Sequence, residues 1–323
     1  MTCDHGDSVA VVIAAYDAAA FIGRAIRSAL AERETTEVIV VDDASSDGTL
    51  QAALESDDGT GRLVVLRQPV NLGPGAARNR GIAVAASAWI AILDADDYLL
   101  PGRLAALIRH AGHADLVADD PLMEREGDLG GRRERVLGVD APLRLTFSAF
   151  VQGNVSRGGR AHREWGYLQP LIRRTFLREH GLAHQEHLRL GEDYELYARA
   201  LAHGARFTVI PAAGYVCVRR DGSLSVRHAI ADLVNLRDCD AGLAAFPGLT
   251  ADDRQAVRRH EVSIECRIRW RLFLDAVAGG RLITAAACFV GPWPVPWHLL
   301  RLSLWRALGA CGLTEDGASW RCR

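Results

Sequence analysis

The 323-residue chain contains no lysine, so all 38 of its basic residues are arginine. Without a lysine amine, three kinds of site are excluded: a Schiff base of the pyridoxal or aldolase type, a Walker A phosphate-binding loop, and an ordinary kinase site. Drift toward GC-rich codons accounts for such a composition, and the many alanines agree with it. The exclusion holds whatever its origin.

Patterned cysteine and strong net charge are also missing. The seven cysteines are scattered and form no CxxC pair, which argues against a disulfide framework or a zinc ribbon and favours a reducing compartment. Residues 1–8 are polar and acidic and do not look like a signal peptide. The formal net charge is −2, whereas nucleic-acid binding calls for a basic face. We therefore expect a globular protein with no nucleic-acid partner.

Short apolar runs alternate with segments of helical spacing through the first hundred residues. The expected strands lie at 9–15, 37–41, 62–68 and 89–93, and the expected helices at 18–30, 49–55 and 76–86. This alternation predicts a doubly wound α/β sheet with helices on both faces, which binds its ligand at the carboxyl ends of the strands. Polar clusters follow three of the strands: Tyr16-Asp17, Asp42-Asp43 and Asp94-Ala95-Asp96-Asp97.

The second half of the chain has weaker patterns. Residues 124–135 are predicted to form a mobile loop, 170–180 and 192–203 helices, 207–211 and 215–219 short strands, and 230–323 a mostly helical extension. His180, His184 and His187 have the spacing of a metal-binding helix face, but Gly181 interrupts it, and we expect packing or surface roles for them.

Asp94 and Asp96 are candidate metal ligands. If the preceding strand continued, carboxylates at i and i+2 would point to one side and repel each other unless a cation lay between them or one took up a proton. Mg²⁺ or Mn²⁺ binds one or two carboxylates and takes its other ligands from phosphate and water. The structural alternative is helix capping by Asp96 or Asp97 in the turn before Pro101.

Four motifs in fixed order resemble those of the family 2 glycosyltransferases of the GT-A fold. They are VIAAYD at 12–17, VIVVDDASSDGT at 38–49, NLGPGAARNRG at 71–81 and LDADD at 93–97. Ala14 stands where the family usually has proline, and Asp17 where it has asparagine. The resemblance is close over residues 9–100 and looser to about residue 230. Within the family, the wording is most similar to bacterial exopolysaccharide transferases of the succinoglycan type.

The resemblance implies a nucleotide-sugar site. Asp43 would receive the uracil base, with Tyr16 packed near it, while Asp94 and Asp96 flank the metal and the donor sugar. The same motifs add Ala14, Asp42, Asn71 and Arg78 to the pocket. A turn role remains the alternative for Asp42, and a structural salt bridge for Arg78.

Residues 191–196, GEDYEL, resemble the family's ED motif. The resemblance makes Asp193 the base that deprotonates the acceptor hydroxyl, with Glu192 as the alternative. An ordinary carboxylate is a weak base for an alcohol, so the role requires close placement and burial. The structural alternative is an acidic pair favoured by a helix N-terminus. Arg219 and Arg220 lie in a segment that resembles the loop closing the family's site, where an arginine fork would suit the leaving diphosphate.

The C-terminal region is basic and rich in tryptophan. Residues 254–323 hold 11 arginines against 5 acidic residues, and five of the seven tryptophans. Such a segment is typical of an anionic membrane surface. Residues 282–300 are uncharged, and spanning, surface contact and packing within the protein all remain open for them. Pro292, Pro294 and Pro296 argue against a spanning helix.

Taken together, the motifs predict an inverting, metal-dependent glycosyltransferase. It would use Mg²⁺ or Mn²⁺ and move a hexose from a UDP-sugar to a hydroxyl of a lipid-linked (polyprenyl-diphosphate) or polysaccharide acceptor, at the cytoplasmic face of the membrane. Residues 1–230 would form the GT-A catalytic domain, with a nucleotide-sugar half (1–120) and an acceptor half (121–230), and 231–323 the extension. The alternatives are a sugar-phosphate nucleotidyltransferase, whose glycine-rich loop is missing here, and a non-catalytic nucleotide-sugar or glycan-binding module.

Overall fold

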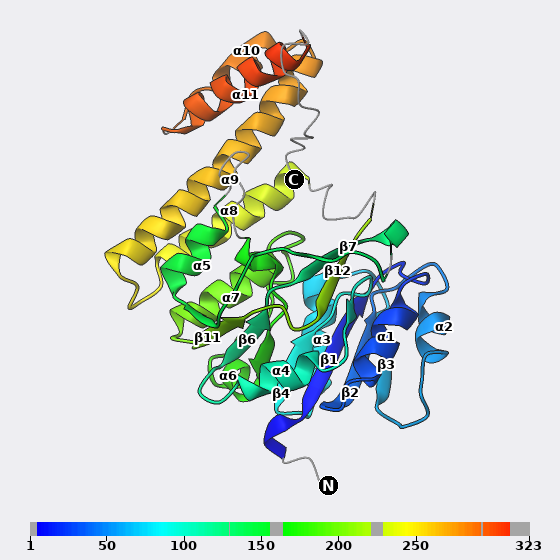
Figure 1. Ribbon diagram of the computed structural model, residues 1–323. Coiled ribbons are helices and arrows are strands. Elements are labelled where there is room, and N and C mark those ends of the chain that lie inside the picture. The colour runs from blue at the N-terminus through cyan, green and yellow to red at the C-terminus, as the bar shows by residue number, and fades with distance from the viewer. Residues whose placement is uncertain (1–4, 129, 156–163, 221–228, 292, 311–323) are drawn as a thin grey trace.

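The computed structural model describes residues 5–128, 130–155, 164–220, 229–291 and 293–310 (Figure 1). Its main sheet has eight strands in the order β3-β2-β1-β4-β10-β6-β11-β9. Their bounds are β1 (Val9–Ala15), β2 (Thr35–Asp42), β3 (Leu63–Arg67), β4 (Trp89–Ile92), β6 (Leu116–Asp119), β9 (Leu143–Leu145), β10 (Leu171–Arg173) and β11 (Phe207–Ile210).

The main sheet is mixed in strand direction. β3, β2, β1 and β4 are parallel, whereas β10 runs antiparallel to both of its neighbours, β4 and β6. β11 is parallel to β6 and antiparallel to β9. The parallel group brings the carboxyl ends of β1, β2 and β4 to one edge, where the predicted polar clusters follow them.

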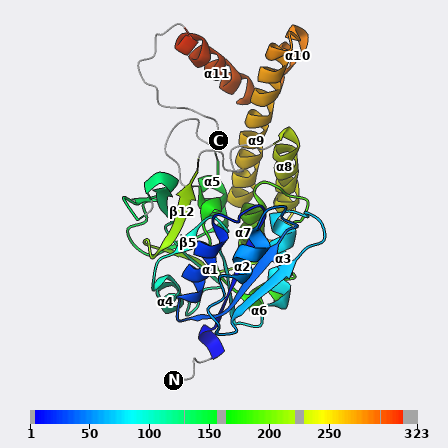
Figure 2. The same cartoon turned by 90° about the vertical axis from the view of Figure 1, so that its right-hand side faces the viewer.

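Helices cover both faces of this sheet (Figures 1 and 2). Because side chains alternate along a strand, β1 contributes Val9 and Val11 to one face, and Ala10 and Val12 to the other. The first face packs against α1 (Ile22–Leu30), α2 (Thr49–Leu54) and α4 (Arg103–Arg109). The second packs against α3 (Pro74–Val84), α5 (Phe147–Gly153), α6 (Arg174–Glu179) and α7 (Glu192–Ala202). The predicted doubly wound architecture is confirmed.

The chain also forms a second, four-stranded sheet. It comprises β5 (Tyr98–Leu99), β12 (Tyr215–Arg219), β7 (Leu122–Arg125) and β8 (Glu134–Arg135), and single turns of 3-10 helix lie at His5–Asp7, Glu126–Asp128 and Trp165–Tyr167. The prediction of a loop over residues 124–135 is wrong at its ends, which pair in this sheet as parts of β7 and β8. Buried Glu124 organises the segment by accepting hydrogen bonds from the Tyr98 hydroxyl and from Arg133.

The helix predicted over residues 170–180 is also wrong in its first part. Residues Leu171–Arg173 form β10, and the helix α6 begins only at Arg174. Leu171 and Ile172 are buried on opposite faces of the main sheet, between β4 and β6. Pairing on both sides outweighs the helical spacing of these apolar residues, and Pro170 favours an extended entry.

The C-terminal extension is helical, as predicted for the part that is described. It comprises α8 (Ile230–Ala244), α9 (Ala251–Ala278), α10 (Leu282–Ala287) and α11 (Val295–Ala310). Leu233 of α8 and Ala256 of α9 belong to the same core as α5 and α7. The far end of α9 stands away from the sheet and carries α10 and α11 (Figure 2).

Residues 282–300 are divided between two helices, α10 and α11. In the described part of the chain, no helix is both long enough and apolar enough to cross a membrane. The division of the chain at residue 230 stays a prediction.

Candidate active site

Arg78 lies at the centre of the site and joins motifs that are far apart in the sequence. It is 5% exposed and projects from α3. Its Nη2 lies 2.7 Å from Oδ1 of Asp94, and its Nη1 lies 2.7 Å from Oε1 of Glu192 and 3.3 Å from Oδ1 of Asp193. One guanidinium group therefore connects the aspartates that follow β4 to the acidic pair at the start of α7.

This cluster shifts the protonation of its members. Burial raises the pKa of Asp193 to about 8, with Arg78 opposing the shift and Glu192 and Asp94 adding to it. Burial disfavours the charge on Arg78, but Asp193, Asp94 and Glu192 raise its pKa well above the ordinary value. Asp193 thus has the raised pKa that a general base for an alcohol needs.

His184 is a neighbour of Asp193 whose role the sequence did not reveal. Its Nδ1 lies 3.7 Å from Oδ1 of Asp193, and neither ring nitrogen has a hydrogen-bond partner among the described residues. Burial and the nearby Arg78 lower the pKa of His184 to about 3, so the ring is neutral. Asn79 fixes its position by donating to the His184 carbonyl and accepting from its backbone N–H.

Residues 94–97 form a turn, in which the Asp97 N–H donates to the Asp94 carbonyl. The expected extension of β4, with two carboxylates on one side of a strand, is therefore wrong in its geometry. Asp94 instead lies between two partners, since its Oδ1 meets Arg78 and its Oδ2 accepts a hydrogen bond of 3.2 Å from Gln169.

Gln169 is a second residue that sequence reasoning missed. Its backbone carbonyl accepts from Arg103, which in turn pairs with Asp119 at 2.9 Å in a fully buried contact. The following Pro170 marks an extended segment, but no motif singled out Gln169 itself.

Asp96 is held from the other side of the site. Its carboxylate pairs with Arg220, whose guanidinium lies 4.1 Å from the ring centre of Phe21, and its carbonyl accepts from Arg24. Arg219 is exposed at the end of β12. Residues 221–225, the rest of the predicted closing loop, lie outside the described residues.

Asp97 connects this turn to β12. It is buried and accepts hydrogen bonds from the Tyr215 hydroxyl (2.9 Å) and the Val218 N–H (2.8 Å), both on β12. Burial, with Asp94 and Asp96 nearby, raises the pKa of Asp97 well above its ordinary value. It connects the turn that carries Asp94 and Asp96, which are partly exposed, to the second sheet.

The predicted nucleotide-binding residues gather at the ends of β1 and β2. Asp43 accepts three hydrogen bonds, from the Gln68 side chain and from the N–H groups of Leu72 and Gly73, which fix the loop before α3. Tyr16 is 45% exposed beside it.

Three further predicted nucleotide-binding residues are Asp42, Asn71 and Ala14, and the first two have hydrogen-bond partners within the protein. Asp42 accepts from the Ser45 N–H, as a turn residue does. Asn71 accepts from Arg189 at 3.0 Å, and Ala14 lies partly buried in β1.

Two carboxylates of this site are accessible to a metal ion. The side chains of Asp94 and Asp96 are 37% and 26% exposed, although each already contacts an arginine. The described residues contain no group of three or more His, Cys, Asp or Glu side chains arranged to hold a metal. The arrangement fits Mg²⁺ or Mn²⁺ only in the two-carboxylate manner, with substrate phosphates completing the ligand set.

Comparisons with known proteins show the family of the chain. The model of Glycosyl transferase family 2 matches residues 10–176. The chain is 46% identical to the succinoglycan biosynthesis protein ExoU of Rhizobium meliloti, over 85% of this chain and 80% of that protein. It is 43% identical to ExoO of the same organism, over 69% of this chain and 64% of that protein.

Solved structures share the fold. S. aureus TarS in complex with UDP-GlcNAc superposes with a TM-score of 0.64 at 19% identity, covering 87% of this chain and 90% of that one. The mannosyltransferase PcManGT from Pyrobaculum calidifontis, in complex with GDP-Man and Mn²⁺, gives a TM-score of 0.58 at 18% identity, covering 97% and 82%. These likenesses establish a GT-A-like fold.

Proposed function

The chain belongs to glycosyltransferase family 2, and we propose that it is an inverting enzyme that transfers a hexose from a UDP-sugar to an acceptor hydroxyl. The observation that carries the proposal is the contact of Arg78 with both Asp94 and Asp193. Because Arg78 contacts both carboxylates, only one side chain separates the candidate base, Asp193, from the candidate donor site at Asp94.

In the proposed reaction, Asp193 accepts the proton of the acceptor hydroxyl. The oxygen forms a bond to the anomeric carbon as the bond from that carbon to the diphosphate oxygen breaks, and UDP leaves on the opposite face. An α-linked donor would thus give a β-glycoside. Mg²⁺ or Mn²⁺, when held by Asp94 and Asp96, would offset the charge of the leaving diphosphate. Arg220, beside Asp96, is the chain's own candidate for the same charge.

For the donor, we propose that the base lies against Tyr16 and Asp43. The exposed ring of Tyr16 supports this assignment. The Asp43 carboxylate already accepts three hydrogen bonds, so its position is fixed before any nucleotide binds. A carboxylate offers about four lone pairs, which leaves one for a base N–H.

For the pathway, the likeness to ExoU supports a role in the biosynthesis of a succinoglycan-type exopolysaccharide. The acceptor we propose is a lipid-linked or polysaccharide glycan, met at the cytoplasmic face of the membrane. Residues 1–230 would perform the chemistry, and the extension 231–323 would attach the enzyme to the membrane surface.

The test is the release of UDP from UDP-glucose, UDP-galactose and UDP-N-acetylglucosamine, with Mg²⁺ or Mn²⁺ and with a chelator. Wild-type protein should turn over one donor in a metal-dependent manner, and turnover should be strongly reduced in Asp193→Asn and in Asp96→Ala. Glu192→Gln is the matched control, because it tests whether Glu192 rather than Asp193 acts as the base. Full activity in the Asp193 and Asp96 variants would refute the site.

A further inference from the structure

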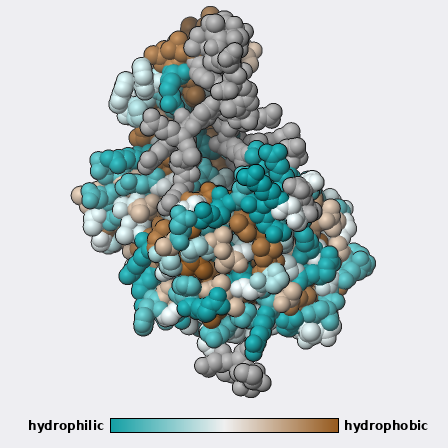
Figure 3. Space-filling view, in the orientation of Figure 1, coloured by the Kyte–Doolittle hydropathy of each residue, from teal (hydrophilic) through white to brown (hydrophobic). Residues whose placement is uncertain are grey.

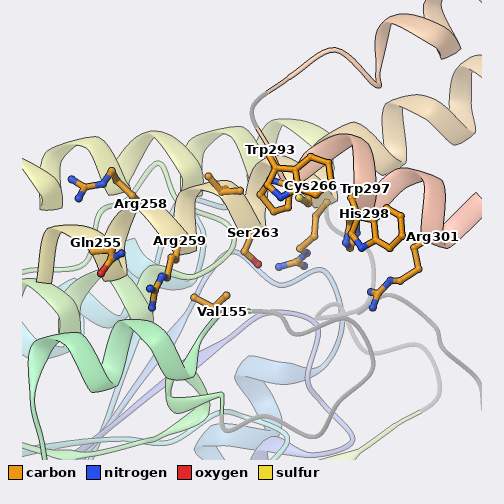
Figure 4. Close-up of a pocket in the computed structure, with 13 residues that line it drawn as sticks. Val155, Gln255, Arg258, Arg259, Ser263, Cys266, Trp293, Trp297, His298 and Arg301 are labelled. Atoms are coloured by element: carbon orange, nitrogen blue, oxygen red, sulfur yellow. The ribbon is translucent and has the colours of Figure 1, made fainter. Parts of the chain in front are cut away.

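A groove with a cavity volume of about 500 Å³ lies in the helical extension, between α9 and α11 and beside Val155 at the end of α5 (Figure 4). Its charged side chains are Arg258, Arg259 and Arg267 on α9 and Arg301 on α11. No carboxylate lines it among the described residues. In Figure 4, Arg259 and Arg301 come from different helices and point to the same side.

Exposed aromatic and apolar side chains border these arginines. Trp293 and Trp297 line the groove, are 74% and 55% exposed, and stack with ring centres 6.4 Å apart. Leu282, Ile283 and Val290 are exposed nearby in sequence, and Figure 3 shows hydrophobic residues gathered over α10. Exposing such a cluster of apolar side chains to water is unfavourable in free energy.

We propose that this groove binds the phosphate head group of an anionic phospholipid, while the apolar side chains of α10 enter the bilayer interface. Arginine forks match phosphate oxygens, and tryptophan favours the depth of the head groups. The apolar border favours a membrane over a soluble phosphate compound, because only a lipid offers an apolar partner next to its charge. The inference rests on the proposed membrane attachment and gives it a defined site.

A series of contacts also connects the groove with the start of α7. Val155 lines it, and the adjacent Asn154 accepts a hydrogen bond of 2.8 Å from the Gly166 N–H. Gly166 lies close to Tyr194, since a Cβ added to Gly166 would lie 3.6 Å from the Cβ of Tyr194. Since Tyr194 follows Asp193 directly, these contacts connect the groove to the helix that carries the candidate base.

The experiment is vesicle co-sedimentation of the full chain. Wild-type protein should bind vesicles containing phosphatidylglycerol more tightly than vesicles of phosphatidylcholine alone, and salt should weaken the binding. The Arg258→Gln/Arg259→Gln variant should lose about five-fold in affinity for each arginine. The matched control, Arg33→Gln/Arg109→Gln, removes the same charge from exposed sites on the α/β body and should bind as wild type does. Trp293→Ala/Trp297→Ala should also weaken binding, without changing the charge.

Several outcomes would overturn the inference. One is equal binding to neutral and anionic vesicles, and another is an equal loss in the control variant, which would make net charge the cause. A third is binding of inorganic diphosphate in the groove without any binding of vesicles, which would assign the groove to a soluble anion. UDP release to a soluble acceptor separates the two proposals, because the groove variants should retain it. If wild type bound vesicles through the groove but released no UDP, the proposed catalysis would fail and this site would stand.

Discussion

At the scale of single residues, the site depends on one buried cation balanced against several acids. Arg78 is almost fully buried, and three carboxylates lie within 3.3 Å of its guanidinium nitrogens. Removing one partner of a buried ion pair is costly because it leaves the others without compensation. The structure thus shows the salt bridge that was the alternative for Arg78, and because its partners are the candidate site residues Asp94 and Asp193, the salt bridge does not exclude the proposed role in the site.

The first prediction concerns Arg78 itself. Arg78→Met should lower the free energy of unfolding by about 3–5 kcal/mol, because Glu192 and Asp94 would remain close together without a cation. Arg78→Lys is the control, since it keeps the charge but cannot contact three carboxylates in one plane, and it should lose less stability. Denaturant unfolding at neutral pH measures both. A Met variant as stable as the Lys variant would contradict the prediction.

The second prediction separates activity from stability at Asp193. Its raised pKa, about 8, means that the folded protein holds a proton that the unfolded chain releases near pH 4. Folding stability should therefore fall as the pH rises from about 4 to about 8, and Asp193→Asn should remove that contribution. Relative to wild type, the melting temperature of the variant should therefore rise as the pH increases from about 4 to about 8.

The same substitution should reduce turnover by about 10²–10⁴-fold, the usual contribution of a general base. In wild type, kcat/KM should increase with pH up to about 8, as Asp193 loses its proton. A flat pH profile in wild type, or a variant that melts progressively below wild type as the pH rises, would argue against this assignment.

The sequence motifs singled out the charged residues of the candidate site but not the neutral residues beside them, Gln169 and His184. The motifs led to Arg78, Asp94 and Asp193, because charge in a fixed pattern is visible along the chain. Gln169 belongs to no motif, and the spacing of His184 with His180 and His187 gives no sign of a contact with Asp193; tertiary contacts alone bring Gln169 and His184 to the carboxylates. Their positions follow from β10 and from the Asn79 side chain, neither of which the spacing of residues reveals.

At the scale of elements, the parallel half of the sheet was predictable and the antiparallel insertion was not. Strands such as β1 and β4 are buried on both faces and read as continuous apolar runs. The three residues of β10 carry too little pattern to distinguish a strand from the first turn of a helix. Their antiparallel pairing with β4 and β6 is a property of the whole sheet.

The third prediction concerns the packing of α3 on the sheet. A Cβ added at Gly81 would lie 2.5 Å from Cγ1 of Val12, so the absence of a side chain lets α3 approach β1. Gly81→Ala should destabilise the protein by about 1–3 kcal/mol through overpacking. In the matched control, Gly242→Ala in α8, the added Cβ meets no described atom within 4 Å.

The control should be neutral or slightly stabilising, because alanine is the better helix former. Thermal unfolding of the two variants compares the effects directly. If both alanines shifted the melting temperature equally, close approach would not be the reason for the glycine at position 81.

At the scale of the whole molecule, the helical extension is joined to α7, the helix of the candidate base, through a buried polar contact. Asp240 of α8 accepts a hydrogen bond from the Tyr194 hydroxyl (3.2 Å) through one oxygen, and its other oxygen lies 2.8 Å from Nδ1 of His260 on α9. The rings of Tyr194 and His260 stack with centres 4.3 Å apart. Three helices therefore meet one residue away from Asp193, and we expect the extension to help hold the candidate base.

The last prediction tests this connection. Asp240→Ala should lower the free energy of unfolding by about 1–3 kcal/mol for each buried partner it leaves without an acceptor, Tyr194 and His260. The matched control is Asp238→Ala on the same helix, where the side chain is 60% exposed and pairs with Arg237, and where a change within about 0.5 kcal/mol is expected. If the extension positions α7, Asp240→Ala should also reduce kcat for UDP release at temperatures where the variant stays folded, because Tyr194 adjoins the base. Loss of stability with unchanged kcat would leave the extension as an independent attachment, with no part in placing Asp193.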